Sequence, residues 1–557
     1  MIEQAARVLL AAGALAWGYA LVKAWRRGAR DSRLLLAPLA FLLVDAWLAV
    51  PAGCAPRLTF ATLRLLSPAL ALAAFFASRR GARFGWLAHA GALAAAALAA
   101  RSLWSVRYGL GGIDFFAYLD FARDALDGVA ATARQRLVYF PGVYLFWEAA
   151  LLAASRALPG VQLWFAGTLF LGAALCGWAV FRVTRSLPAA LGAGAIQLVF
   201  GLTLEARRGM TEAIALIPLL AGVGAWAGAP LRGRDGLLRA CALGAGLGAS
   251  IFFKQQVALL SLGWLALVAL RAGGFRELFA VPLSAVLALL LLLVPTGGLD
   301  ALRAGLLLVK SYPAEGSFVG NLAFLAPALS PLLLYGGLAA AAALLLAVRG
   351  FDDARLRAAA FCLLAAAVSL LQLRTRAYIH YTLLPLPMLV LGIACMGQLL
   401  LEKLPQHAAS AAVALAALAA PVLVQGRASL PLLTQATALH DWPYGSPAQP
   451  ILEELAPRAR GLGAFVIPPV NGGVHFLLGT RALGWPQAYF WGAAETGDAS
   501  KAVQDPQVRL VVVRRIFGRQ VERQVCAAAG CDAALAALPA LGYQRLIDSP
   551  DVIVWQR

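Results

Sequence analysis

The stretch Gly111-Gly-Ile-Asp-Phe-Phe-Ala-Tyr-Leu-Asp-Phe-Ala-Arg-Asp-Ala-Leu-Asp-Gly128 lies in the first long polar gap, residues 104–142, of an otherwise apolar chain. Between 115 and 127 the residue types repeat with helical spacing. One helix face collects Phe115, Tyr118, Leu119, Ala122 and Leu126, while Asp120, Arg123, Asp124 and Asp127 point elsewhere. The pattern predicts a helix that lies along a membrane surface and ends at Gly128, a suitable C′ residue.

The acidic residues of this stretch fall into two groups. A solvated helix face is a sufficient explanation for Asp120, Asp124 and Asp127. Asp114 differs because it follows the flexible Gly111-Gly112 pair at the junction between the loop and the preceding apolar block. A carboxylate at such a junction is partly desolvated and can act as a base. Asp114 is therefore the candidate catalytic residue.

The composition places the whole chain in the membrane class. Hydrophobic residues make up 61% of the 557 residues and charged residues 13%, with a mean hydropathy of +0.77. Soluble domains average about 45–50% apolar and about 25% charged residues. The apolar blocks have the length that crosses about 30 Å of hydrocarbon, so we expect an α-helical polytopic membrane protein with about 13–15 transmembrane helices. The predicted spans are 5–22, 34–50, 58–77, 85–103, 161–181, 188–203, 211–229, 237–252, 257–270, 277–295, 321–348, 356–372, 380–400 and 408–425.

The basic residues indicate the orientation of the spans. They fill alternate gaps, at 23–33, 79–83, 182–185, 232–239, 271–276, 349–357 and Lys403, which we expect to be cytoplasmic. The N-terminus is then outside, provided that a weaker apolar block at 143–157 makes no net crossing. The same distribution explains the net charge of +20 without nucleic-acid binding, which we do not expect.

The tail after residue 425 changes character. It contains turn signals, a predicted helix at 447–459 and short β-rich runs at 464–467, 508–513, 543–547 and 552–555. We therefore expect two domains: a transmembrane module at 1–425 and an extracytoplasmic α/β domain at 426–557. Cys526 and Cys531 either form a disulfide, which suits an oxidising compartment, or remain unpaired beside a helix end.

Further charges lie in outward-facing gaps between spans. The junction 204–212 holds Glu205, Arg207, Arg208 and Glu212, the next holds Lys254 and Gln255, and a third holds Arg374, Arg376, His380 and Tyr381. Basic residues on this side oppose the positive-inside rule, so they need an anionic partner, for which phosphate is the natural candidate. The two glutamates either hold a divalent cation with Asp114 or pair with Arg207 and Arg208, and we favour pairing. The five histidines show no metal-ligand spacing.

These motifs resemble those of the GT-C membrane glycosyltransferases. The arrangement Asp-x-x-x-Tyr with a later Gly and Tyr-x-Pro is similar to the first outer loop of polyprenol-phosphate-sugar-dependent mannosyltransferases and of their protein O-mannosyltransferase and lipid A aminoarabinose transferase relatives. The matching positions are Asp114, Tyr118, Gly128, Tyr139 and Pro141. The junction before Glu212, the Lys254-Gln255 pair and the segment from His380 to Pro387 also look like signatures of that group. The loop lacks the adjacent acidic pair that would indicate metal dependence.

The resemblance implies an inverting glycosyltransferase of the bacterial inner membrane. Its donor would be a sugar on a polyprenyl phosphate and its acceptor a hydroxyl of a lipid, glycan or protein. Asp114 would deprotonate the acceptor. The phosphate would be held by Arg207, Arg208, Lys254, Arg374, Arg376 and His380, and substrate contacts would come from Tyr118, Tyr139, Glu205, Glu212, Gln255 and Tyr381. The resemblance fixes no cofactor and leaves a divalent cation open.

Two other classes of protein compete with this interpretation. A lipid or glycolipid transporter or flippase would also use outer basic residues, but transporters usually place ionisable groups near the bilayer midplane. In this chain the charges lie at one face and the middle of each span is nearly pure Ala, Leu, Val and Gly. A non-catalytic scaffold would leave Asp114 and the outer basic residues unexplained.

Overall fold

A computed structural model describes part of the chain in two compact units. The described residues are 113–128, 141–204, 206–227, 233–269, 275–296, 298–299, 317–349, 353–374, 378–403, 442–444, 446–468, 472–481, 499–516, 523, 526–527 and 529–557. One unit comprises Met1–Arg107 with Ala153–Ala436, and the other Tyr108–Leu152 with Thr437–Arg557. The predicted spans at 5–22, 34–50, 58–77, 85–103 and 408–425 lie outside the described residues.

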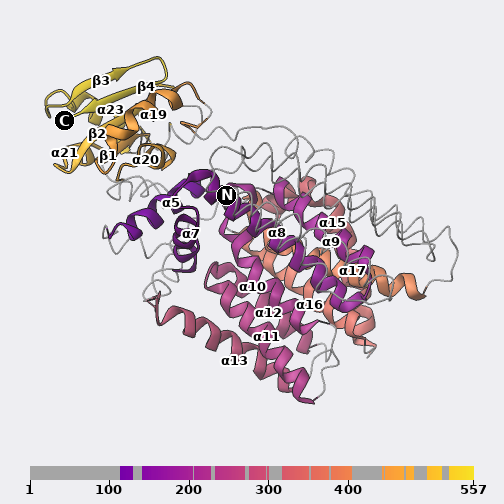
Figure 1. The fold of residues 1–557 in the computed structure, drawn as a ribbon. Helices are drawn as coiled ribbons and strands as arrows, with labels where there is room; N and C mark the ends of the chain where they lie inside the picture. The colour runs from indigo at the N-terminus through magenta and orange to yellow at the C-terminus, as the bar shows by residue number, and fades with distance from the viewer. Residues whose placement is uncertain are drawn as a thin grey trace, which may run out of the picture. The chain divides into compact units, whose positions relative to one another are not determined.

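The first unit is a bundle of apolar helices (Figure 1). Its elements are α8 (Leu158–Thr184), α9 (Leu187–Thr203), η1 (Ala206–Arg208), α10 (Thr211–Trp226), α11 (Gly233–Ile251), η2 (Gln255–Leu259), α12 (Leu260–Ala269), α13 (Phe275–Leu293), α15 (Phe318–Val348), α16 (Ala354–Ser369), η3 (Leu370–Arg374), η4 (Ile379–Leu383) and α17 (Pro385–Lys403). Each predicted span between 161 and 400 coincides with one of these helices or with a helix and its adjoining 3-10 turn. The expected helical membrane fold is confirmed here.

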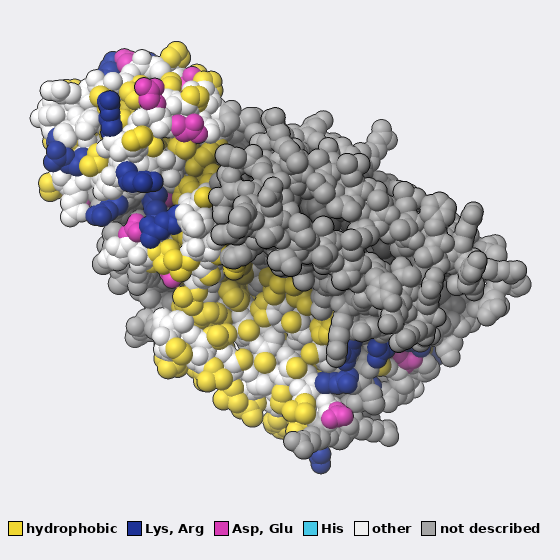
Figure 2. Space-filling model, viewed as in Figure 1, with side chains coloured by type: hydrophobic (Ala, Val, Ile, Leu, Met, Phe, Trp, Pro, Cys, Tyr) yellow, Lys and Arg dark blue, Asp and Glu magenta, His cyan; other side chains and the backbone are white. Residues whose placement is uncertain are grey.

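Length and hydropathy support membrane insertion of this unit. Among the described residues, three helical segments are long and apolar enough to cross a membrane: Gly160–Thr184, Ala354–Arg374 and Ile379–Leu399. Figure 2 shows hydrophobic side chains spread over the visible face of the bundle, with Lys and Arg gathered at one edge. Such a surface is suited to contact with lipid.

Helix contacts in the bundle depend on small residues. α11 packs against α10 on one side and α13 on the other, while α16 contacts α12, α15 and α17. A Cβ added at Gly248 would overlap the backbone oxygen of Ala285, so only glycine allows α11 and α13 to approach this closely. Arg182 near the end of α8 interacts electrostatically with Arg239 near the start of α11. Because successive helices run in opposite directions, these two helix ends are expected on the same side of the membrane.

The second unit contains α5 (Ile113–Leu126), α7 (Pro141–Ala153) and the C-terminal α/β domain. The elements of that domain are α19 (Ala448–Ala459), β1 (Gly463–Ile467), α20 (Gly472–Leu478), α21 (Ala499–Gln504), β2 (Val508–Arg514), α23 (Cys531–Ala537), β3 (Gln544–Asp548) and β4 (Val552–Gln556). The strands form one sheet in the order β1-β2-β4-β3, with β1 and β2 parallel and the other pairs antiparallel. The predicted helix and four strands of the tail are all present.

Alternation along the strands gives the sheet two buried faces. Phe465 and Val511 pack with α21 and α23, whereas Val466 and Val512 pack with α19 and α20. Successive strand residues point to opposite faces, so apolar residues at every position require helices on both sides. The domain is therefore a three-layer α/β structure with its own core.

The helix α7 covers most of the apolar block predicted at 143–157, so its length and exposure indicate whether that block crosses the membrane. It has 13 residues, which corresponds to a length of about 20 Å at 1.5 Å per residue, less than the hydrocarbon thickness of about 30 Å. Leu145 and Leu152 remain 43% and 63% exposed. A helix of this length with exposed leucines fits the interfacial alternative, in which the block makes no net crossing.

Cys526 and Cys531 form a disulfide beside α23, which settles the choice left by the sequence. We predict that neither thiol reacts with a maleimide in the denatured, unreduced protein, and that both react after reduction. Peptide mass spectrometry reports each site, and the buried Cys362 is the internal control because it needs only denaturation. Labelling of Cys526 and Cys531 before reduction would contradict the pairing.

Candidate functional site

A buried ion pair lies where α10 meets the end of α11. Glu212 is in the first turn of α10, and its Oε1 is 2.9 Å from Nζ of Lys254. The two side chains are 1% and 14% exposed. Thr211 donates a hydrogen bond from its hydroxyl to Oε2 of Glu212 at 3.2 Å. A carboxylate near a helix N-terminus is also favoured by the helix dipole, so the sequence of α10 itself helps to hold this charge.

The break in the helix at residues 252–254 positions the lysine. α11 ends at Ile251, and Lys254 adopts an extended conformation before η2 begins at Gln255. In an uninterrupted helix, the direction of the Lys254 side chain would follow from the rotation of 100° per residue. The extended backbone at Lys254 instead directs that side chain toward Glu212 of α10. The amino group faces Glu212, while the Lys254 side chain as a whole keeps 14% of its exposure.

The chain between α16 and α17 adds aromatic and imidazole groups to the same end of the bundle. The amide of Gln372 donates to the backbone oxygen of Tyr381 at 2.5 Å, which ties η3 to η4. Nζ of Lys254 lies 6.0 Å from the ring centroid of Tyr381, the outer range of a cation–π contact. His380 and Tyr381 make an edge-to-face contact at 5.0 Å, and His380 is near enough to Glu212 to interact electrostatically.

The structure thus brings together Glu212, Lys254, His380 and Tyr381 from three separate parts of the sequence, all of which the sequence predicts as site residues. The half-buried Arg208 lies in η1, three residues before α10, and the half-buried Gln255 begins η2. Arg374 ends η3 with an exposed side chain. Glu205, Arg376, Tyr139 and the side chains of Arg207 and Asp114 lie outside the described part of the chain, although Asp114 itself is the second residue of α5.

A pairing of Glu212 with Arg207 stays a prediction, because the Arg207 side chain lies outside the described residues. The described partner of Glu212 is Lys254 from the next helix end, which the sequence did not predict. The physical reason is that Glu212 is fully buried at the start of α10, where a partner must approach from a packed neighbour. Among the described residues there is no group of three His, Cys, Asp or Glu side chains arranged to hold a metal ion.

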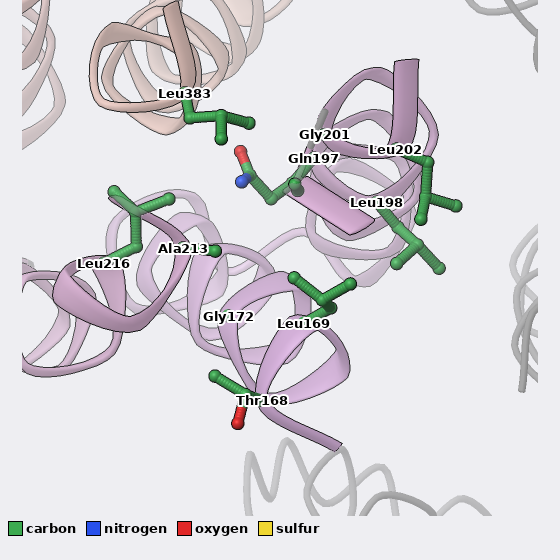
Figure 3. A pocket seen from close by; sticks show the side chains of 11 residues that line it. Thr168, Leu169, Gly172, Gln197, Leu198, Gly201, Leu202, Ala213, Leu216 and Leu383 are labelled. Atoms are coloured by element: carbon green, nitrogen blue, oxygen red, sulfur yellow. The ribbon is translucent and has the colours of Figure 1, made fainter. Parts of the chain in front are cut away.

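A pocket in the bundle is lined by residues of α8, α9, η1, α10 and η4, some of which are neighbours of the ion-pair residues in sequence (Figure 3). Ala213 follows Glu212 directly, Leu383 comes two residues after Tyr381, and both line the pocket. Gln197 of α9 is 6% exposed, and its Oε1 has no hydrogen-bond partner among the described residues. Sequence reasoning missed Gln197, although a lone amide in the middle of an apolar span is the signal that would have found it.

α5 and the C-terminal domain form a second cluster within their own unit. Asp120 is 1% exposed and pairs with Arg123 at 3.2 Å, and Arg123 donates to the backbone oxygens of His475 at 2.8 Å and Thr480 at 2.6 Å. The expectation of a solvated face was therefore wrong for Asp120, because α20 covers that face. It holds for Asp127, which is exposed. Tyr118, a predicted substrate contact, is 4% exposed and packs against Trp147 of α7.

Taken together, the first unit is an apolar helical bundle with a charged cluster at one end and the second unit carries an α/β domain, which describes a polytopic helical membrane protein. The chain is similar to two crystal structures of ArnT from Cupriavidus metallidurans, one bound to undecaprenyl phosphate and one in the apo state. The TM-scores are 0.55 and 0.54, at 15% and 14% identity, and each match covers 85% of this chain and 98% of ArnT. This likeness confirms the predicted fold. No protein-family model and no curated protein sequence matches the chain.

The buried ion pair predicts that loss of one charge destabilises the protein more than loss of both charges. Lys254→Met leaves the buried Glu212 carboxylate without its partner and should cost about 3–5 kcal/mol. The double variant Glu212→Gln/Lys254→Met removes both charges and should recover most of that loss. Thermal unfolding of the purified protein in detergent measures both effects. Equal destabilisation by the single and double variants would show that the charges are not coupled.

His475 predicts a pH dependence of the C-terminal domain. Burial, reinforced by the positive charge of Arg123, lowers the pKa of His475 from 6.5 to about 3. Between these values the unfolded state binds more protons than the folded state, so stability contributed by the neutral ring is complete above 6.5 and falls as the pH falls toward 3. His475→Asn can keep the hydrogen bond that Nδ1 makes with Thr480 Oγ1.

We therefore expect wild type to unfold at a higher temperature than His475→Asn at about pH 7, with the gap narrowing by about pH 4. Scanning calorimetry over this range checks it. A gap that stays constant with pH would exclude a buried neutral histidine.

Proposed function

We propose that this protein is an inverting glycosyltransferase that moves a sugar from a polyprenyl-phosphate donor to a hydroxyl acceptor at the outer face of the membrane. The observation that carries the proposal is the charged cluster around Glu212, Lys254 and His380 at one end of a GT-C bundle. ArnT from Cupriavidus metallidurans has a similar fold, and one of its crystal structures is bound to undecaprenyl phosphate. The sugar of this chain's donor would be a pentose or a hexose.

Lys254 is suited to hold the donor phosphate. An ammonium group has three donors, and Glu212 accepts from one side while the partial exposure of Lys254 leaves another side for a ligand. The pair itself is neutral, so the proposed function assigns the net attraction for an anion to further basic residues, which are Arg207, Arg208, Arg374, Arg376 and His380. As the bond to the sugar breaks, negative charge grows on the leaving phosphate, and preorganised cations stabilise that charge most.

Asp114 would act as the general base. It removes the proton of the acceptor hydroxyl while the oxygen attacks the anomeric carbon from the side opposite the phosphate. The anomeric carbon–oxygen bond breaks, its electron pair stays on the polyprenyl phosphate, and the configuration inverts. Tyr139, Glu205, Gln255 and Tyr381 would contact the substrates. The mechanism needs no metal ion, although a divalent cation beside the phosphate is a further arrangement to test.

Two observations support an outer placement. α5 from the first long loop and the C-terminal domain form one unit, as expected if loop 104–142 and domain 426–557 share one side of the bilayer. The Cys526–Cys531 disulfide belongs in an oxidising compartment, such as the one outside a bacterial inner membrane. The orientation inferred from the basic gaps puts the Glu212 and Lys254 junctions on that side too.

We predict that Asp114→Asn lowers transfer from polyprenyl-phosphate sugars by at least about a hundredfold, the contribution expected of a general base. Asp127→Asn, an isosteric change at an exposed carboxylate after α5, is the control and should retain activity. Donors carrying different sugars are tested with a crude acceptor extract in lipid nanodiscs. Unchanged transfer by Asp114→Asn would remove Asp114 from the mechanism, and absence of transfer by wild type with all donors would favour a flippase.

A further inference from the structure

α5 is attached to the C-terminal domain through a buried guanidinium. Arg123 is 8% exposed, and its two terminal nitrogens donate to the backbone oxygens of His475 and Thr480 while one of them also pairs with Asp120. A buried guanidinium is costly unless its donors are satisfied. The planar fork of arginine makes two directed hydrogen bonds to fixed carbonyls, which defines the position of a helix more closely than an apolar contact does.

The receptor for Arg123 is preformed within the C-terminal domain. The backbone nitrogen of Thr480 donates to the oxygen of His475 at 3.1 Å, and the Thr480 hydroxyl lies 3.1 Å from Nδ1 of His475. Two hydrogen bonds therefore connect the first and last residues of segment 475–480. Both carbonyls that accept from Arg123 belong to this segment, so hydrogen bonds within the domain help to fix their positions.

A second contact lies two turns earlier on the same face of α5. Phe116 stacks on Tyr444 with ring centroids 5.0 Å apart and an interplanar angle of 5°. Gly473 faces Phe116 closely: a Cβ there would lie 3.5 Å from the Phe116 ring. Phe116 and Arg123 are seven residues apart, about 10 Å along the helix at nearly the same angle. Two anchors so separated fix both the position and the rotation of α5.

The opposite side of α5 is held by α7. Phe115 makes an edge-to-face contact with Trp147 at 5.2 Å, and Tyr118 stacks near the same indole at 6.4 Å. α5 is thus enclosed between α7 and the C-terminal domain. Asp114 immediately precedes Phe115 and Phe116, the two residues that contact these opposite neighbours. Any rotation or shift of the helix would displace Asp114 with it.

We infer that the C-terminal domain acts as a clamp on α5, and that Arg123 is a positioning residue that sets the place of Asp114 for catalysis. The inference rests on the proposed role of Asp114 as the base. It gives the C-terminal domain a catalytic purpose: the domain holds the helix that carries the base. Misplacement of a reacting group by about 1 Å can lower a rate by about a hundredfold, so the loss of one anchor should have a large effect on turnover.

The test measures kcat and donor KM for the full-length protein in nanodiscs. Arg123→Gln should lower kcat by about tenfold or more, with donor KM changed by less than about threefold, because the donor phosphate does not bind to α5. Arg123→Lys should restore part of the loss by keeping the charge and at least one hydrogen bond. Phe116→Leu, at the other anchor, should likewise lower kcat. Arg458→Gln, an exposed change on α19 of the same domain, is the control and should match wild type.

A double-variant cycle separates positioning from general damage. If Arg123 acts through Asp114, then Arg123→Gln should cause no further loss in an Asp114→Asn background. Hydrogen exchange should show faster exchange across 113–126 in Arg123→Gln with β2 and β4 unchanged. Wild-type kcat in Arg123→Gln, an equal additional loss in the Asp114→Asn background, or loss of protection in β2 and β4 would each overturn the inference.

The two proposals can fail separately. If wild type transfers no sugar from any donor, the proposed function fails, and with it the catalytic meaning of the clamp. If wild type transfers sugar and depends on Asp114 but tolerates Arg123→Gln at full kcat, the function stands and the positioning role is excluded.

Discussion

The ion pair between Glu212 and Lys254 is the constraint on which the charged end of the bundle depends. Neither charge is tolerable alone in that apolar setting, since an unpaired buried ion costs several kcal/mol. The pair fixes the start of α10 against the junction of α11 and η2, and it presents one ammonium group beside Tyr381. The ammonium group of Lys254 and the aromatic and imidazole groups of η4 thus lie together at one end of the bundle, where the proposed function places an anionic ligand.

The second constraint is the enclosure of α5. A surface helix would need only an amphipathic pattern, yet α5 buries Asp120 and Arg123 as well as its apolar face. In the proposed function, the first unit would hold the leaving phosphate and the second unit would carry the base that receives a proton.

Much of the fold follows from local pattern. Hydropathy located the helices from α8 to α17 because lipid-facing segments must be continuously apolar, and β-branched runs located all four strands of the tail. The cluster of Glu212, Lys254, His380 and Tyr381 was also predicted in outline, since charges at span ends are costly and therefore informative. The partner of Glu212 and the burial of Asp120 were not, because both depend on contacts between segments far apart in the sequence. Gln197 was not predicted, because the average hydropathy of a span does not reveal a single amide within it.

The proposed function requires that Lys254, held by Glu212, binds a polyprenyl phosphate. Titration of undecaprenyl phosphate into the full-length protein in nanodiscs tests this binding, with Lys254→Gln compared with wild type and with Arg349→Gln, an exposed control after α15. All variants are measured at a temperature at which they remain folded. We predict that Lys254→Gln weakens binding by at least about tenfold, the loss expected of a charge-assisted contact, while Arg349→Gln has no effect. Equal affinity of wild type and Lys254→Gln would contradict the assignment of the phosphate site.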